Sequence, residues 1–265
     1  MRKILNYISS NIVSRNVRFL NKHKGEECYL IGNGASLKHF DLSQFSDKIS
    51  FGCNELRIHN DLHHLNLKYY IGLHPLSYCK YWRGVKTGFH IEQNPFYKHT
   101  HSFNNNNYEM FVHASNYPFT RDYDKFNYIH NYMKNSLSID TIDFSSSSSF
   151  STGGLEAMIG LAIYMGFKKI YLVGCDYWFS PKGEGHFYTE DEPPGEKNIF
   201  LYDKLLKVIS EKVELVVVTR NGFKSSANYI EYSELTGMEE NKKAPCEIVS
   251  EKYLSTMNAV SYLRG

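Results

Sequence analysis

The sequence lacks cysteines placed to form a disulfide framework or a zinc site. It has 265 residues and only five cysteines, an odd number without a Cys-x-x-Cys pair: Cys28, Cys53, Cys79, Cys175 and Cys246. Disulfide scaffolds and structural zinc sites need paired or clustered cysteines. Three of the five stand in apolar, strand-like runs, where a reduced buried thiol is ordinary. We therefore expect a protein of a reducing compartment, the cytoplasm.

Long apolar runs and an excess of one charge are also missing. No stretch approaches the roughly 20 apolar residues that span a bilayer, and residues 1–24 lack the apolar core and cleavage site of a signal peptide. The net charge is only +2, from 30 Lys and Arg against 28 Asp and Glu. The basic residues are scattered, whereas nucleic-acid binders carry a clustered basic face. We expect no nucleic-acid partner.

The length and the 42% of hydrophobic residues suit one α/β domain with a lid rather than two full domains. We expect a basic helix over residues 1–24 and a Rossmann-like catalytic domain over residues 25–235. Loop-rich inserts are expected at about 114–150 and 177–197, and a helical tail over residues 236–265.

The segment 1–24 has apolar residues near helical spacing with Arg and Lys among them. Two interpretations stay open. The helix packs on the domain or on a second subunit of a homo-oligomer, or it rests as a basic amphipathic helix on the inner face of the membrane.

Short apolar runs alternate with helical patterns in the order of a parallel α/β sheet. Six apolar runs that end in small or polar residues, or are directly followed by them, are predicted strands: 27–31, 49–54, 67–73, 109–113, 169–176 and 213–219. Segment 155–167 is almost continuously apolar and predicts a buried helix, and further helices are expected near 199–212 and 250–263. This alternation predicts a mainly parallel sheet flanked by helices. Ligands bind such sheets outside the carboxyl ends of the strands.

A glycine turn follows the first strand, with the sequence Gly32-Asn33-Gly34-Ala35-Ser36. Two glycines allow close approach of a phosphate, and the free N–H groups of a following helix attract an anion. A tight strand-to-helix turn needs glycine even without a ligand, so both interpretations stand. The turn lacks the Gly-Lys-Ser/Thr of a Walker A loop and the third glycine of the dinucleotide fingerprint, which disfavours NAD.

Polar residues follow two other predicted core elements. Asn54 comes directly after the second strand and is expected to face the same crevice, or else to satisfy its own backbone in a turn. Ser151-Thr152-Gly153-Gly154 precedes the buried helix. Its hydroxyls and N–H groups suit either an anion or a plain helix cap.

Asp176 ends the clearest strand of the middle region, and Tyr177 and Tyr188 lie in the loop after it. The carboxylate of Asp176 suits a ribose hydroxyl or a base amine, and a tyrosine hydroxyl suits a leaving phosphate. His186, the only histidine in the second half of the chain, stands between the tyrosines. A neutral imidazole suits a general base, although a loop histidine is also an ordinary solvated side chain.

Metal binding has little support in the sequence. His63 and His64 are adjacent and would point apart, and the acidic run Glu190-Asp191-Glu192 is typical of a solvated face. We expect no required cofactor, and Mg²⁺ has no motif in its favour.

Taken in order, these motifs resemble the bacterial sialyltransferases of glycosyltransferase family 42. They are also similar to the broader DUF115 family, which includes flagellar motility accessory factors, hydroxymethylpterin diphosphokinase-like proteins and many products of surface-polysaccharide gene clusters. The resemblance spans about residues 27–235. It includes Gly32-Asn33-Gly34 with Ser36-Leu37, Cys53-Asn54, Thr152-Gly153 and Ile170-Tyr171-Leu172 with Gly174 and Asp176.

The resemblance implies an inverting, largely metal-independent transfer of an acidic sugar from a CMP-sugar to a glycan or lipid-linked oligosaccharide, as in lipopolysaccharide or capsule biosynthesis. It places donor binding on Asn33, Asn54 and residues 151–154, and catalysis on His186. Tyr177 and Tyr188 would stabilise the leaving phosphate.

The chain departs from the family pattern at three places. The loop that carries His186 is shorter than the lid of the sialyltransferases and is more similar to the DUF115 type. His74-Pro75 replaces an Asn-Pro, and Phe150-Ser151 replaces the arginine before the Thr-Gly. Sialic acid, Kdo, pseudaminic acid and legionaminic acid therefore all remain candidate sugars. Two other functions stay open, a diphosphokinase-like phosphotransferase and a non-catalytic nucleotide-binding scaffold in polysaccharide or flagellar assembly.

Overall fold

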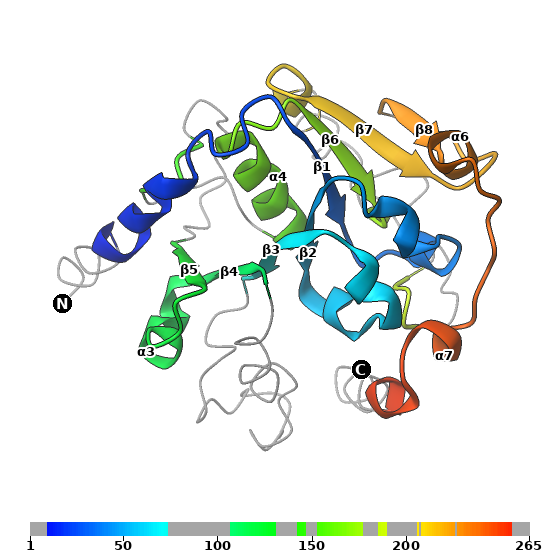
Figure 1. The fold of residues 1–265 in the computed structure, drawn as a ribbon, viewed down its shortest axis with the longest axis horizontal. Helices are drawn as coiled ribbons and strands as arrows, with labels where there is room; N and C mark the ends of the chain where they lie inside the picture. Colours follow the sequence, from blue (N-terminus) through cyan, green and yellow to red (C-terminus); the bar gives the residue numbers. More distant parts are fainter. Residues whose placement is uncertain are drawn as a thin grey trace.

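An open sheet of parallel strands forms the centre of the molecule (Figure 1). The computed structural model describes residues 10–73, 107–130, 142–146, 153–176, 185–189, 206, 208–225 and 227–255. Within them the strand order is β5-β4-β3-β2-β1-β6-β7-β8. The strands are β1 (Glu27–Ile31), β2 (Ile49–Cys53), β3 (Leu67–Gly72), β4 (Glu109–His113), β5 (Phe126–Ile129), β6 (Lys169–Val173), β7 (Glu214–Thr219) and β8 (Tyr229–Glu231).

Helices and short 3₁₀ turns cover both faces of the sheet. The 3₁₀ segments are η1 (Ser14–Phe19), η2 (Ala35–Lys38), η3 (Leu42–Phe45), η4 (Asn54–Ile58), η5 (Asn60–His64) and η7 (Ala114–Asn116). The α-helices are α3 (Tyr117–Thr120), α4 (Gly154–Tyr164), α6 (Tyr232–Thr236) and α7 (Pro245–Ile248). The sequence prediction of a single Rossmann-like α/β fold is confirmed.

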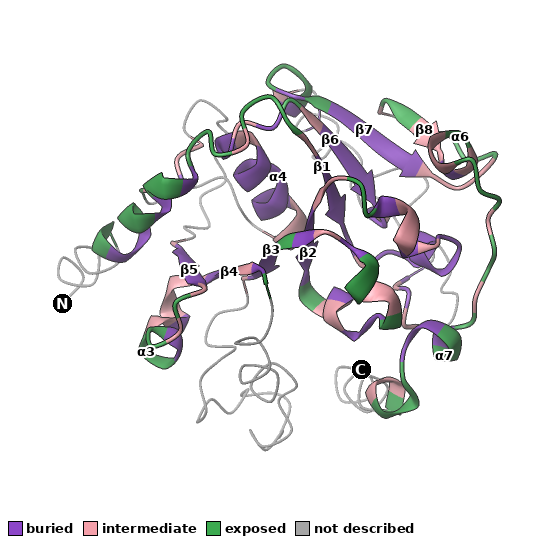
Figure 2. Ribbon diagram, in the orientation of Figure 1, coloured by how far each residue is buried: buried purple, intermediate pink, exposed green. Residues whose placement is uncertain are grey.

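Most residues of strands β1 to β7 are buried (Figure 2). Each face of the sheet has its own layer of apolar side chains. Cys28 and Leu30 of β1 point to the layer that contains α4. Tyr29 and Ile31 point to the opposite layer, with residues of η2 and η3. Strands covered on both sides read as continuous apolar runs rather than alternating ones, which is the pattern that predicted them.

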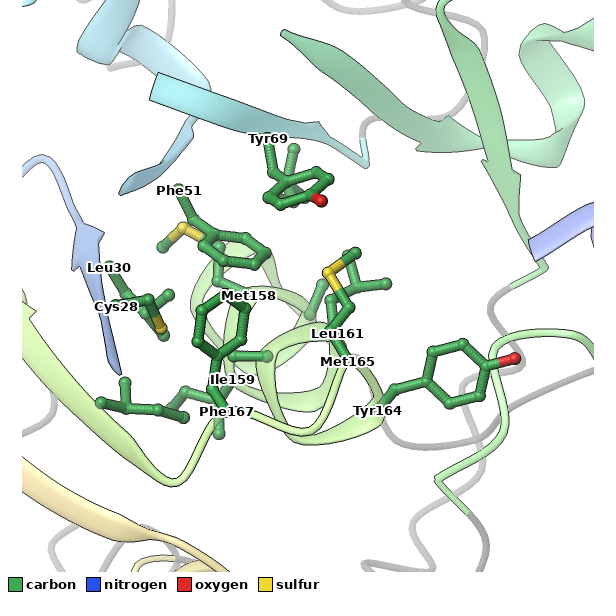
Figure 3. Close-up of a cluster of buried hydrophobic side chains, with 14 of the residues drawn as sticks. Cys28, Leu30, Phe51, Tyr69, Met158, Ile159, Leu161, Tyr164, Met165 and Phe167 are labelled. Atoms are coloured by element: carbon green, nitrogen blue, oxygen red, sulfur yellow. The ribbon is translucent and has the colours of Figure 1, made fainter. Parts of the chain in front are cut away.

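Helix α4 is the centre of the first layer. Met158, Ile159 and Leu161 are fully buried, and Figure 3 shows them beside Phe51 and Tyr69 of neighbouring strands. A helix that is apolar on nearly every side is stable only when it is enclosed. This burial fixes the N-terminus of α4 near the carboxyl ends of β1 and β2.

Each of the six predicted strands lies inside its predicted segment, but two predictions differ from the structure. The helix expected after the glycine turn is η2, a single 3₁₀ turn of four residues. The insert 114–150, predicted to be loop-rich, contains strand β5. Strand β5 was missed because it is only four residues long and has a single aliphatic residue, Ile129, and pairing with β4 supplies its stability.

The described part of the N-terminal segment packs on the domain. Asn16 is buried, and its Nδ2 donates to the carbonyl oxygens of Tyr128 and Phe144, both at 2.8 Å. Arg18 forms an ion pair of 3.0 Å with Glu109. Asn16 and Arg18 thus connect this segment to β5 and β4. Among the described residues, no helix combines the length and apolarity needed to span a membrane.

Residues 239–249, here called the C-terminal strap, cross the face of the sheet that carries η2. The backbone N–H groups of Asn241 and Lys243 donate to the carbonyl oxygens of His39 and Lys38, at 3.2 and 2.8 Å. Val249 pairs with His59 in an isolated antiparallel bridge. The predicted helical tail thus begins as an extended segment with the short helix α7, and residues 251–255 are helical.

His59, under this strap, is expected to make stability depend on pH. Burial lowers the pKa of its imidazole from 6.5 to about 4; nearby Asp61 raises this pKa by a smaller amount, and Lys243 lowers it further. The unfolded chain then binds the proton more readily, so the free energy of unfolding is unaffected above pH 6.5 and falls towards pH 4. Between pH 7 and pH 5 the loss is about 2 kcal/mol.

Urea unfolding at both pH values measures this loss, and His59→Asn is the matched variant. His59 Nδ1 accepts from the N–H of Asp61 at 3.1 Å as a helix cap. Asparagine also caps helices but does not titrate. The variant should lose less stability than the wild type between pH 7 and pH 5, and an equal loss would show that His59 is not the responsible group.

Candidate functional site

The chain reverses its direction of strand addition at β1. Strands β2 to β5 extend the sheet on one side of β1, and β6 to β8 extend it on the other side. Open parallel sheets bind ligands outside the carboxyl ends of the strands at such a switch point. Gly32 and Asn33 leave β1 at this edge, and Gly174 to Asp176 leave β6 beside them.

The glycine turn lies directly against the end of β6. The N–H of Gly34 donates to the carbonyl oxygen of Gly174 at 2.7 Å, and the N–H of Ser36 donates to Oδ2 of Asp176 at 2.8 Å. A Cβ atom on Gly34 would lie 2.1 Å from that carboxylate oxygen. The turn therefore requires glycine for its contact with β6.

This geometry changes what the turn offers to a ligand. Two of its N–H groups already donate to protein acceptors, and η2 has too few residues to act as an anion-binding helix start. Asp176 holds the start of η2 in the place that the sequence suggested for a phosphate. The fold-only interpretation therefore accounts for Gly32, Gly34 and Ser36.

Asn33 is the residue of the turn whose side chain contacts the end of the neighbouring strand β2. Its Nδ2 donates to the carbonyl oxygen of Cys53 at 3.3 Å, which joins the ends of β1 and β2. Its Oδ1 is buried and has no hydrogen-bond partner within the described part of the chain. A buried acceptor without a donor is costly, so this oxygen suits an N–H or O–H group of a bound molecule.

His186 packs against the same turn, although it is distant in the sequence. It pairs with Gly34 in an isolated antiparallel bridge, and its Nδ1 lies 3.3 Å from the carbonyl oxygen of Asn33. A carbonyl oxygen only accepts, so Nδ1 carries a proton, and in the neutral imidazole the lone pair is then on Nε2. The sequence singled out both residues, and the structure brings them together across 153 positions of the chain.

Neighbouring side chains hold the imidazole in place. The ring of Tyr188 stacks on it at 4.8 Å with an interplanar angle of 16°. Thr189 closes the turn, since its Oγ1 accepts from the N–H of His186 at 3.1 Å. Phe187 is fully buried and anchors the segment in the core. The imidazole is thus half-buried on a fixed turn rather than in free solution.

The second predicted binding pair also meets at this edge. A Cβ atom on Gly154, at the start of α4, would lie 3.2 Å from Nδ2 of Asn54. Asn54 has a φ of 50°, in the left-handed region that few residues other than glycine adopt. This strained backbone places the Asn54 amide beside the N-terminus of α4.

Glu156 is a site residue that the sequence analysis missed. It stands in the first turn of α4 with only 8% of its surface exposed. Its Oε2 lies 2.6 Å from the position that a Cβ on Gly153 would occupy. A carboxylate at this position stabilises the helix N-terminus, and a Glu at the third helical position is the only sequence signal for it.

The remaining predicted residues and the thiols are placed as follows. Tyr177, Ser151 and Thr152 lie outside the described residues. Burial raises the pKa of the Cys53 thiol to about 12 and that of the Cys175 thiol well above its ordinary value. Both are therefore protonated and unreactive near neutral pH.

No group of three His, Cys, Asp or Glu side chains in the described residues is arranged to hold a metal ion. The sequence contains one Asp-x-Asp triplet, Asp122-Tyr123-Asp124, which the motif analysis overlooked. It precedes β5 and lies at the amino edge of the sheet, away from Asn33 and His186.

Solved structures to which this chain is similar include glycosyltransferases. The sialyltransferase CstII from Campylobacter jejuni, in complex with the substrate analogue cytidine-5′-monophosphate, is 18% identical with a TM-score of 0.48, over 89% of this chain and 99% of that chain. CST-II in complex with a trisaccharide acceptor and CMP is 17% identical with a TM-score of 0.47, over 89% and 100%.

MAf glycosyltransferase from Magnetospirillum magneticum AMB-1 is 10% identical with a TM-score of 0.49. The match covers 97% of this chain and 42% of that one, so the chain spans less than half of that protein. No family model and no curated protein matches the sequence. These likenesses concern the fold alone.

Proposed function

We propose that the protein is an inverting glycosyltransferase that transfers an acidic sugar from a CMP-sugar to a surface glycan or lipid-linked oligosaccharide. The observation that carries this proposal is the imidazole of His186, held on the Asn33 turn with Nδ1 as the donor. The choice of a CMP-sugar rests on the motif order described above. We place the reaction in the cytoplasm, at the inner face of the membrane.

The mechanism follows from the tautomer of His186. Nε2 takes the proton of the acceptor hydroxyl while the hydroxyl oxygen bonds to the anomeric carbon. The bond from that carbon to the phosphate oxygen breaks on the opposite side, CMP leaves with the electron pair, and the configuration inverts. The Asn33 carbonyl and the stacked ring of Tyr188 stabilise the imidazolium that results.

The donor is held by amides rather than by a glycine cradle. The Oδ1 of Asn33, unpartnered within the described residues, accepts from the nucleoside, and the side-chain N–H of Asn54 donates to the phosphate. Asp176, Ser151 and Thr152 are the other residues that we propose to contact the CMP-sugar. Tyr177 donates to the departing phosphate in place of a metal ion.

A thermal-shift panel with CMP, CDP, UDP, GDP, ADP and ATP, each in EDTA and in Mg²⁺, tests the nucleotide. A ligand at about 100 times its dissociation constant adds about 2.7 kcal/mol of stability. We expect stabilisation by CMP or CDP in both conditions. Stabilisation by ATP with Mg²⁺ alone would instead favour the phosphotransferase, and CMP binding without turnover of any CMP-sugar would favour the scaffold.

Asn54→Gly is expected to separate binding from stability. Glycine adopts the positive φ of this position without strain, so the free energy of unfolding should stay within about 1 kcal/mol of the wild type. The amide is lost, and CMP affinity should fall about tenfold, the effect of one hydrogen bond to a charged group. Calorimetric titration with CMP measures this, and unchanged affinity would remove Asn54 from the site.

A further inference from the structure

Lys38 is a buried cation that the glycosyltransferase motifs leave unexplained. It is the last residue of η2, and only 2% of its surface is exposed. Its Nζ donates to the carbonyl oxygen of Thr189 at 3.2 Å. An ammonium leaves water only where groups of the protein replace its hydration, and the Thr189 carbonyl is one such group. The charge therefore points to a role that an apolar residue cannot perform.

Thr189 connects this ammonium to His186. The N–H and the Oγ1 of Thr189 both donate to the carbonyl oxygen of His186, at 3.1 and 3.0 Å. One end of the segment 185–189 is thus held by Asn33 and Gly34, and the other end is held by Lys38. Its central residue, Phe187, is fixed in the core.

The backbone of Lys38 is itself fixed from the opposite side. Its carbonyl oxygen accepts from the N–H of Lys243 in the C-terminal strap at 2.8 Å. The next residue, His39, accepts from Asn241 in the same strap and lies 3.6 Å from the carboxylate of Glu240. The backbone of Lys38 is therefore bound to the C-terminal strap, separately from the segment that its side chain contacts.

We propose that Lys38 is a positioning residue for His186, whose ammonium fixes the Thr189 carbonyl and so keeps the imidazole on the Asn33 turn. This inference rests on the proposed function. It predicts that the charge matters for catalysis although it lies behind the reacting groups, and that donor binding at Asn33 and Asn54 does not depend on it.

The test compares Lys38→Met, which keeps the aliphatic volume, with Lys38→Arg, which keeps a charged donor. Lys242→Met, at an exposed position of the strap, is the matched control. Lys38→Met should lower kcat about 10- to 100-fold, the size expected when a reacting group shifts by about 1 Å. KM for the CMP-sugar should change less than threefold, Lys38→Arg should recover much of kcat, and the control should resemble the wild type.

Amide hydrogen exchange of the segment 185–189 is the second measurement, and it needs no substrate. Exchange should become at least tenfold faster in Lys38→Met and stay slow in Lys38→Arg. Unchanged exchange in Lys38→Met, or a kcat within twofold of the wild type, would overturn the proposal. If the wild type transfers no sugar, the proposed function fails, while the exchange result still decides whether Lys38 holds the segment.

If Lys38→Met does not fold, Lys38→Gln provides the same comparison. Glutamine retains an N–H donor for the Thr189 carbonyl but carries no charge. We expect faster exchange of the segment 185–189 and a lower kcat than in Lys38→Arg. Equal values in the two variants would show that a hydrogen bond suffices and would overturn the role of the charge.

Discussion

Replacing His186 by alanine or asparagine is expected to abolish sugar transfer while CMP binding stays intact. Removal of a general base lowers kcat by about 10² to 10⁴. Asparagine is the sharper variant, because its side-chain N–H can still donate to the Asn33 carbonyl although it provides no base. The measurement is the initial rate of transfer from a CMP-sugar, together with calorimetric titration of CMP.

His64→Ala is the control for this prediction, because His64 is exposed and lies outside the site. It should retain wild-type kcat. Transfer by His186→Asn at a rate close to that of the wild type would remove His186 as the base. Loss of CMP binding in the same variant would instead place His186 among the groups that hold the donor.

Replacing Gly32 by alanine is expected to destabilise the protein by about 3 kcal/mol or more. The new Cβ would lie 2.3 Å from the carbonyl oxygen of Gly174 and 2.9 Å from its carbon. That carbonyl is backbone and accepts from the N–H of Gly34, so it cannot move without breaking the junction of β1 and β6. Urea unfolding followed by circular dichroism measures the loss.

Gly25→Ala separates this clash from backbone strain. Gly25 has a φ of 83°, and nothing lies within 4 Å of its added Cβ. Strain alone should cost about 1 kcal/mol there. A loss for Gly32→Ala no larger than that for Gly25→Ala would show that the β1–β6 junction adapts to a side chain. The glycine turn would then owe its sequence to a ligand rather than to the fold.

The amino-acid sequence was sufficient to predict most strands of the sheet and its central buried helix. The apolar runs that became β1, β2, β3, β4, β6 and β7 were recognisable because strands covered on both faces need continuous apolar residues. Helix α4 was recognisable for the same reason. Since parallel strands place their carboxyl ends on one edge, the polar residues that follow them, Asn33, Asn54 and Asp176, were expected to gather there.

The hydrogen-bond partners of those residues became apparent only in the three-dimensional structure. The hydrogen bond between His186 and Asn33 spans 153 positions, and the one between Asp176 and Ser36 spans 140. No local pattern encodes such distant partners. In the latter contact the carboxylate of Asp176 accepts from an N–H group of the glycine turn. That N–H group is then not available to a phosphate, and the turn instead joins the ends of β1 and β6.

The burial of Lys38 and Glu156 also could not be predicted from the sequence. Each is a charged residue in a sequence position that reads as exposed, and each is buried by elements far away in the chain. Local composition sets which segments form strands and helices, because their stability depends on nearby residues and on burial in general. Which charge is enclosed, and which imidazole nitrogen keeps its proton, depends on contacts that exist only after the sheet has assembled.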